Sequence, residues 1–275
     1  MADTNTVPHS LTVIRSTAYY TYSEGRLKSY GRFNPRQLKI NGGWVEFRLE
    51  PSQEKVESPE YVKVIMDKND GERQYFTLMD GEHAGKDASI ALEGKNHSEY
   101  LINRVRYDEA IEIKIQAKVF DISQGKIRDR KYSDVNGKHY NQLLADLTYG
   151  GKTGMTPITT VEITLDSNEN DEYYPLPAGR YKILIPDFPH GKAEKYHKNY
   201  HQVWFPIEYN GIKTESYIHV GHASEGCVTV IETEKWGELY QYLISHRMPN
   251  DPKYIGTLVI NYPFEVRRRE KFLEL

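Results

Sequence analysis

Cysteine is the residue that this sequence has least of, because Cys227 is the only one in 275 residues. A single cysteine excludes an intramolecular disulfide, so a buried core must stabilise the fold, and a chain of this length can build one. Long apolar runs are also missing, since no stretch approaches the roughly 20 apolar residues that a helix needs to cross a bilayer. We therefore expect a globular protein with no membrane span.

An excess of basic charge is missing too. The formal net charge is -3, and charges of both signs are interspersed along the chain. The one basic run, at residues 267–271, is typical of a solvated tail, so we expect no nucleic-acid partner. The first ten residues are polar and lack the apolar core of a signal peptide. We expect synthesis in the cytoplasm without Sec-dependent export.

Alternation of apolar and polar residues, the pattern of half-buried strands, recurs through the whole chain. The segments with this pattern, or with a short apolar run bounded by turn residues, are 11–14, 18–22, 37–40, 44–49, 62–66, 73–78, 111–120, 160–165, 174–185, 202–209, 214–220, 228–231 and 254–262. Asn69-Asp70-Gly71 and Asn210-Gly211 separate pairs of such segments and predict hairpins. The sequence therefore predicts a mainly β fold.

Helical signals are few. A short helix is expected over 140–147, ended by Gly150-Gly151. A second helix is expected after Thr233, which would be its N-cap. The apolar residues of this helix recur at i, i+3, i+4, i+7 and i+8, namely Trp236, Leu239, Tyr240, Leu243 and Ile244. We expect that helix to pack on the sheet. The glycines near 150 suggest a β-rich domain over 1–150 and a second domain over 151–275, with one continuous β-domain as the alternative.

The segment 217–230 concentrates the residues that a cysteine nucleophile needs. His219 precedes Cys227 by eight residues, and a strand, a loop and a returning strand can bring the two side chains onto one face. The thiolate is the reactive form of cysteine, and a nearby imidazole favours it by taking the thiol proton. Gly226 permits a tight turn with backbone N–H groups that can stabilise an oxyanion, and Ser224 can hold the loop. These residues alone leave both a catalytic and a buried, inert thiol open.

Other histidines suggest a second chemistry. His190, His197 and His201 precede that segment, and the last two have the i, i+4 spacing of some zinc sites. Because the stretch lacks the glutamate and the apolar face of a metallohydrolase helix, we expect no metal and no cofactor. Three aromatic residues are expected instead to rim a substrate groove: Tyr200, Trp204 and Tyr217.

The order of the residues around Cys227 resembles the catalytic motif of the L,D-transpeptidase (YkuD-like) superfamily. That motif ends in Ser/Thr-x-Gly-Cys and an aliphatic residue, with an essential histidine upstream. Here the matching residues are His219-x-Gly221 and Ser224-x-Gly226-Cys227-Val228. A second match, Pro177-Ala-Gly179-Arg-Tyr181, resembles the Pro-x-Gly-x-Tyr/Phe stretch that leads into a strand of these domains, and together the matches cover about 155–263.

Two features depart from the commonest pattern of the superfamily. Many members carry Arg or Asn shortly after the cysteine, where this chain has Thr229. The gap between His219 and Cys227 is shorter than in the housekeeping enzymes and is closest to compact phage-type and secretion-effector members.

The resemblance implies a YkuD-like β-domain that acts on peptidoglycan stem peptides. Cys227 would attack the carbonyl that follows a meso-diaminopimelate or similar L-centre, expel the terminal D-amino acid and form a thioester. His219 would serve as base and then as acid, oriented by a backbone carbonyl of residues 220–222, with His222 as the alternative base. Gly221 belongs to the same motif. Transfer to an amine would give transpeptidation or D-amino-acid exchange, and transfer to water would give L,D-carboxypeptidation.

The resemblance, combined with the missing Sec signal, suggests an antibacterial effector that a type VI or similar contact-dependent system exports to the periplasm or cell wall. A secretion-system or immunity protein would then be a partner. The alternatives are a non-catalytic cell-wall or protein-binding module that keeps the fold, and a cysteine hydrolase of other amides. The sequence predicts no specific role for residues 1–150.

Overall fold

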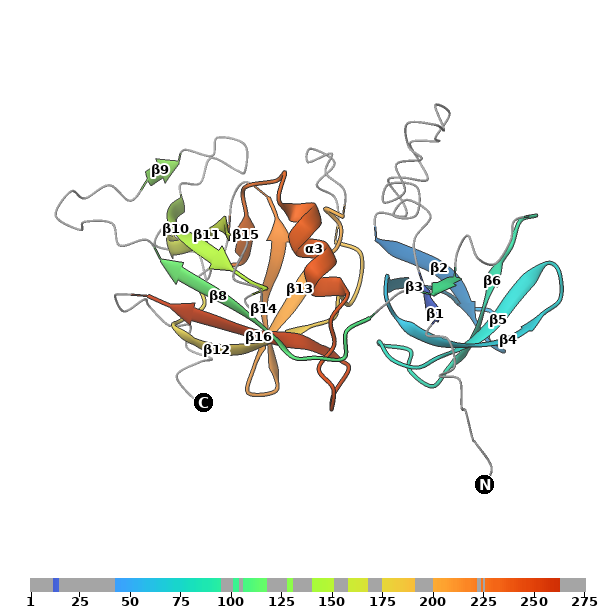
Figure 1. Cartoon of the computed structure of the whole chain (residues 1–275). Helices are drawn as coiled ribbons and strands as arrows, with labels where there is room; N and C mark the ends of the chain where they lie inside the picture. The colour runs from blue at the N-terminus through green and yellow to red at the C-terminus, as the bar shows by residue number, and fades with distance from the viewer. Residues whose placement is uncertain are drawn as a thin grey trace, which may run out of the picture. The chain divides into compact units, whose positions relative to one another are not determined.

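The computed structural model describes residues 12–14, 43–94, 101–103, 106–117, 128–130, 140–150, 158–167, 175–190, 200–221, 224 and 226–262. Within these ranges the chain is mainly β, as predicted, and contains two sheets and one helix (Figure 1). None of these residues forms a helix that is long and apolar enough to span a membrane. The chain divides into two compact units, residues 1–107 with 187–190, and residues 108–186 with 191–275.

The first unit contains a seven-stranded sheet in the order β3-β2-β6-β5-β4-β1-β7. Its strands are β1 (Thr12–Ile14), β2 (Trp44–Leu49), β3 (Lys55–Pro59), β4 (Lys63–Asn69), β5 (Arg73–Leu78), β6 (Asp87–Ala91) and β7 (Leu101–Asn103). The predicted hairpin of β4 and β5 is confirmed, and the Asp70 carboxylate closes its turn by accepting the Arg73 N–H at 2.7 Å. Phe47 and Phe76 pack edge to face in the core of this unit. The strands expected at 18–22 and 37–40 lie outside the described residues.

The second unit contains a nine-stranded sheet in the order β11-β15-β14-β13-β12-β16-β8-β10-β9. Its strands are β8 (Ile111–Ala117), β9 (Arg128–Arg130), β10 (Tyr140–Thr148), β11 (Ile158–Ser167), β12 (Gly179–Leu184), β13 (Phe205–Tyr209), β14 (Ile212–Val220), β15 (Val228–Val230) and β16 (Tyr254–Asn261). Because β11 also pairs with β10, the sheet closes into a ring of eight strands, with β9 attached to β10. The predicted hairpin of β13 and β14 is confirmed. The corner before β12 is held by Tyr181, whose hydroxyl donates to the Pro177 carbonyl at 2.7 Å.

The helix α3 (Trp236–Ile244) lies against this second sheet (Figure 1). All five residues of its predicted apolar stripe are fully buried, and Trp236 packs against Phe205 of β13. The predicted N-cap is wrong. Lys235 occupies that position and its side chain makes no capping hydrogen bond, because a turn over Thr233–Lys235 precedes the helix and Thr233 contributes only its backbone carbonyl.

Two expectations fail in the middle of the chain. The predicted helix over 140–147 is the strand β10, in which Ala145, Leu147 and Tyr149 are buried while the residues between them are half-buried. Pairing with β8 on one side and β11 on the other overrides the local helical pattern. For the same reason the predicted domain boundary at 150 differs from the observed division at 107/108, since β8 and β10 are strands of the second sheet.

Candidate active site

The strands β14 and β15 bring His219 beside the segment that contains Cys227. They run parallel, with Ile218 opposite Val228 and His219 opposite Thr229. Cys227 immediately precedes Val228, so its backbone lies next to the strand that carries the histidine. Neighbouring strands are about 4.8 Å apart. The predicted juxtaposition of a strand, a loop and a returning strand is therefore present.

The site lies on the sheet face opposite α3. Phe205, which packs on α3, is in register with Ile218, so Ile218 faces the helix. Side chains alternate along a strand, and His219 therefore points to the other face. Thr229 is in register with His219 and shares that face, as their side-chain contact confirms.

Two hydrogen bonds fix the His219 imidazole. Nδ1 lies 2.9 Å from the Val220 carbonyl oxygen, and Nε2 lies 3.2 Å from the hydroxyl of Thr229. A carbonyl can only accept, so Nδ1 carries the proton and Nε2 keeps its lone pair, toward which the threonine hydroxyl donates. The histidine is 6% exposed and Thr229 is fully buried, so water does not compete strongly for either bond. This tautomer leaves Nε2 as the basic nitrogen.

Trp204 covers the imidazole. Its ring stacks on His219 with centroids 4.0 Å apart and planes 15° from parallel, and Tyr217 meets the indole edge-on. The indole N–H donates to the His201 carbonyl at 2.9 Å, which fixes the orientation of the indole. Trp204 and Tyr217 are both half-buried. Of the three aromatic residues that the sequence predicts at a substrate groove, these two adjoin the candidate site.

The third groove residue is a correction. Tyr200 is 3% exposed and stacks almost parallel on Tyr240 of α3, with centroids 3.9 Å apart. Its carbonyl accepts a hydrogen bond from the Trp236 indole at 3.2 Å. Tyr200 therefore belongs to the core behind the helix and offers no surface to a substrate.

The turn before Cys227 has the features that its small residues predict. Gly226 is buried and has a φ of +100°, a backbone conformation that disfavours a side chain. Ser224 is 1% exposed, and its hydroxyl donates to the Cys227 carbonyl, which holds the loop as expected. Cys227 itself is half-buried.

Position 221 needs a glycine because Thr229 and His219 pack closely against its Cα. Its N–H donates to the Val230 carbonyl at 3.2 Å, which continues the β14–β15 pairing past the end of β14. A Cβ at this position would lie 3.1 Å from the Thr229 methyl and 3.5 Å from His219 Cε1. A larger residue would therefore press on both side chains that define the imidazole position.

The remaining predicted residues are distributed as follows. His222, the alternative base, and His197 lie outside the described residues. His190 belongs to the group of residues assigned to the first unit, where its Nε2 lies 3.5 Å from an Asp187 carboxylate oxygen. In the part of the chain that the structure describes, no three His, Cys, Asp or Glu side chains gather as metal ligands would.

Two contacts of the site were missed by sequence reasoning, namely the hydroxyl of Thr229 on Nε2 and the stacking of Trp204 on the imidazole. Strand alternation could have indicated Thr229, because it follows Cys227 by two residues. The position of Trp204 depends on the β13–β14 register, which shifts between Pro206 and Glu208 in a way that the Asn210-Gly211 turn does not indicate.

Comparisons of this chain with protein-family models, with curated proteins and with solved structures find no match. The resemblance to the L,D-transpeptidase superfamily therefore stays a prediction that rests on the motif residues.

Proposed function

We propose that this protein is a cysteine-dependent acyltransferase that acts on peptidoglycan stem peptides as an L,D-transpeptidase or L,D-carboxypeptidase. One observation carries the proposal: the imidazole of His219 is fixed by the Val220 carbonyl in the tautomer that leaves Nε2 basic, on the strand next to Cys227. The sequence predicted a backbone carbonyl from this stretch as the orienting group. The nature of the substrate comes from the motif resemblance alone.

The first half-reaction transfers an acyl group to the thiol. The Cys227 sulfur attacks the carbonyl carbon that follows the L-centre of the stem peptide, and its proton passes to His219 Nε2. We assign oxyanion stabilisation to backbone N–H groups of the turn at Gly226 and Cys227. The C–N bond to the terminal D-amino acid then breaks, the leaving nitrogen takes the proton back from Nε2, and a thioester remains on Cys227.

The second half-reaction regenerates the thiol. An amine or a water molecule gives a proton to His219 Nε2 and attacks the thioester carbonyl, and the thiolate leaves and is reprotonated. Thr229 supports both proton states of the ring, because its hydroxyl can donate to neutral Nε2 and can accept from Nε2–H after proton transfer. Trp204 limits rotation of the imidazole by covering one face.

The proposal is tested by incubating wild-type protein and the Cys227→Ala variant with disaccharide-tetrapeptide muropeptides and analysing the products by mass spectrometry. Wild type is expected to release the terminal D-amino acid, or to exchange it when another D-amino acid is added, and Cys227→Ala is expected to do neither. A matched control is Ser52→Ala, which changes a small polar side chain in the first unit.

The alternative, a non-catalytic binding module that keeps the fold, predicts a different outcome. In that case wild type leaves the muropeptides unchanged, and iodoacetamide fails to label Cys227 in the folded protein. Labelling of Cys227 without turnover of muropeptides would refute the peptidoglycan substrate and direct the search to other amides.

A further inference from the structure

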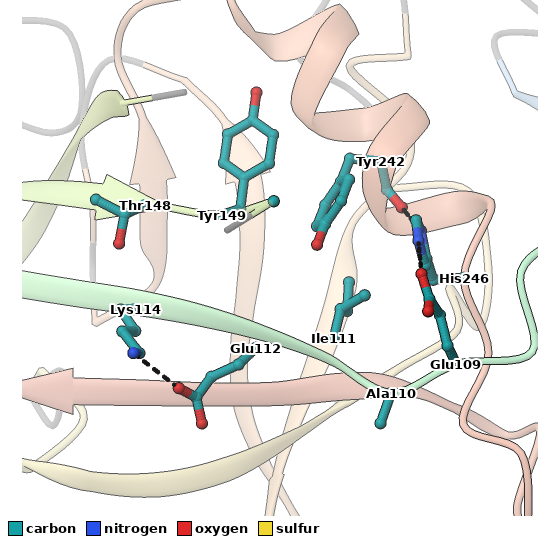
Figure 2. Close-up of a pocket in the computed structure, with 10 residues that line it drawn as sticks. Glu109, Ala110, Ile111, Glu112, Lys114, Thr148, Tyr149, Tyr242 and His246 are labelled. Atoms are coloured by element: carbon teal, nitrogen blue, oxygen red, sulfur yellow. Dashed lines mark hydrogen bonds and ion pairs between the residues drawn. The ribbon is translucent and has the colours of Figure 1, made fainter. Parts of the chain in front are cut away.

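A second recess lies in the nine-stranded sheet at the point where β8 and β10 separate. β8 pairs with β16 from Ile111 onward, but it pairs with β10 only from Lys114, which is opposite Thr148. The backbone segments before Lys114 and after Thr148 therefore diverge. Tyr242 of α3 and His246, which follows the helix, close the space between them (Figure 2). The resulting recess has a volume of about 510 Å³, and the described residues that line it all belong to the second unit.

This recess is separate from the candidate active site. Thr229, Glu162 and Leu144 lie side by side across β15, β11 and β10. Thr148 lies four residues beyond Leu144, in the direction that leads away from Cys227. This corresponds to about 13 Å along the strand from the level of Thr229. A ligand of the recess would thus leave the Cys227 turn uncovered.

Aromatic rings form one side of the recess. The rings of Tyr149 and Tyr242 lie 5.0 Å apart at 46°, and the His246 ring lies 4.7 Å from that of Tyr242. Burial raises the pKa of both tyrosine hydroxyls, so the two phenols are neutral at physiological pH. Ile111 adds an apolar side chain below the rings (Figure 2).

Three charged side chains line the recess. Its lining includes two carboxylates, Glu109 and Glu112, and one ammonium group, that of Lys114. Glu112 accepts hydrogen bonds from Arg180 at 2.7 Å and Lys114 at 3.1 Å, and these bonds lower its pKa. Glu109 is half exposed, and one of its oxygens lies 3.6 Å from His246 Nε2.

The imidazole beside Glu109 does not cancel this charge at neutral pH. His246 Nδ1 donates to the Tyr242 carbonyl at 2.6 Å, and burial lowers the pKa of the ring. At pH 7 the Glu109 carboxylate therefore lies beside neutral aromatic rings, while Arg180 and Lys114 balance the charge of Glu112.

We infer that this recess binds an organic cation, namely an ammonium group on a short aliphatic body. The carboxylate of Glu109 attracts the charge, the half-buried ring of Tyr242 adds cation–π attraction, and Ile111 contacts the aliphatic part. The volume lies within the range of small-molecule sites, about 300–1,000 Å³. An anion would meet the Glu109 carboxylate instead. The inference goes beyond the proposed function and does not depend on it.

Methyl NMR of protein labelled at the isoleucine δ1 carbon tests the inference. Ile111 reports on the recess, and Ile65, an exposed residue of the first unit, is the internal control. We expect n-butylammonium chloride to shift the Ile111 signal saturably and leave Ile65 unchanged, at constant ionic strength. The neutral analogue 1-butanol and the anion butyrate are expected to give little or no saturable shift.

Three variants separate the contributions. Glu109→Gln and Tyr242→Leu should each weaken butylammonium binding by about threefold to tenfold, because one removes the carboxylate and the other the aromatic face. Tyr242→Phe keeps the ring and should bind as wild type does, and Glu54→Gln, an exposed carboxylate of the first unit, is the charge control. The inference is overturned if butylammonium gives no saturable shift at Ile111, if 1-butanol binds equally well, or if Glu109→Gln leaves the affinity unchanged.

Discussion

Replacement of Gly226 by alanine is the substitution whose effect follows most directly from the backbone of the candidate site. Gly226 is buried, immediately precedes Cys227 and has a φ of +100°. An L-residue in this region costs about 1–3 kcal/mol, because its Cβ approaches the neighbouring backbone. We therefore expect Gly226→Ala to lower the free energy of unfolding of the second unit by that amount. For a unit of this size the midpoint of thermal unfolding should fall by about 2–4 °C per kcal/mol.

A second readout reports on the thiol. Because Cys227 is the only cysteine, intact-protein mass spectrometry after iodoacetamide treatment measures the alkylation of this residue alone. If the alanine variant relaxes its backbone toward an ordinary φ, the thiol turns away from its position beside the His219 strand. Alkylation at pH 7 should then be slower than in wild type, because the thiol loses the imidazole that takes its proton in the proposed reaction.

Gly237→Ala is the matched control. The same methyl group is added inside α3, where an added Cβ has no neighbour within 4 Å. Alanine is the better helix former, so this variant should be more stable than wild type by about 0.5–1 kcal/mol and should alkylate at the wild-type rate. If Gly226→Ala unfolds at the wild-type temperature and its thiol reacts at the wild-type rate, the positive φ of Gly226 does not constrain the turn.

Three further substitutions test other parts of the account. Thr229→Val keeps the shape but removes the hydroxyl that faces His219 Nε2, and denaturant unfolding should show a loss of about 1–3 kcal/mol; no loss would contradict the hydrogen bond. Leu239→Ala removes a fully buried side chain of α3 and should cost about 2–5 kcal/mol by the same assay, whereas a smaller cost would mean that α3 packs loosely on the sheet. Burial lowers the pKa of His246 in the fold, so below pH 6.5 the unfolded chain binds more protons and stability falls as the pH decreases. Unfolding at pH 7.5 and 5.5 should show a smaller decrease for His246→Gln than for wild type, and an equal decrease would exclude this role.

Much of the fold could be predicted because its strands have one buried and one less buried face. In β8, for example, Ile111, Ile113 and Ile115 are buried and the residues between them are not, which is the period-two pattern of the sequence. The helix α3 could be predicted for the corresponding reason, since its buried residues recur with helical spacing.

The state of residues 140–147 could not be predicted, because it is decided by strands far away in the sequence. The leucines and the alanine of this segment fit a short helix as well as a strand. Two neighbours, β8 and β11, satisfy its backbone hydrogen bonds and bury Ala145 and Leu147. The predicted domain boundary at 150 differs from the observed division for the same reason, because β8 and β10 belong to the second sheet.

The candidate site was predictable where its residues lie close together in the sequence. Gly226, Ser224 and Gly221 have the conformation, the hydrogen bond and the close packing that their types suggest. The positions of Trp204 and Tyr200 were not predictable from the sequence. Trp204 stacks on His219 because of the way β13 pairs with β14. Tyr200 is buried because it packs against Tyr240 of α3. The recess at the β8–β10 fork combines three distant segments and has no sequence motif.

Intact-protein mass spectrometry of the acid-quenched reaction with a disaccharide-tetrapeptide would detect the proposed thioester itself. We expect an adduct with the mass of the disaccharide-tripeptide acyl group, located on Cys227 after digestion. The adduct should be absent from Cys227→Ala and should form much more slowly in His219→Gln. Release of the terminal D-amino acid by Cys227→Ala, or an unmodified Cys227 in wild-type protein during turnover, would contradict the account.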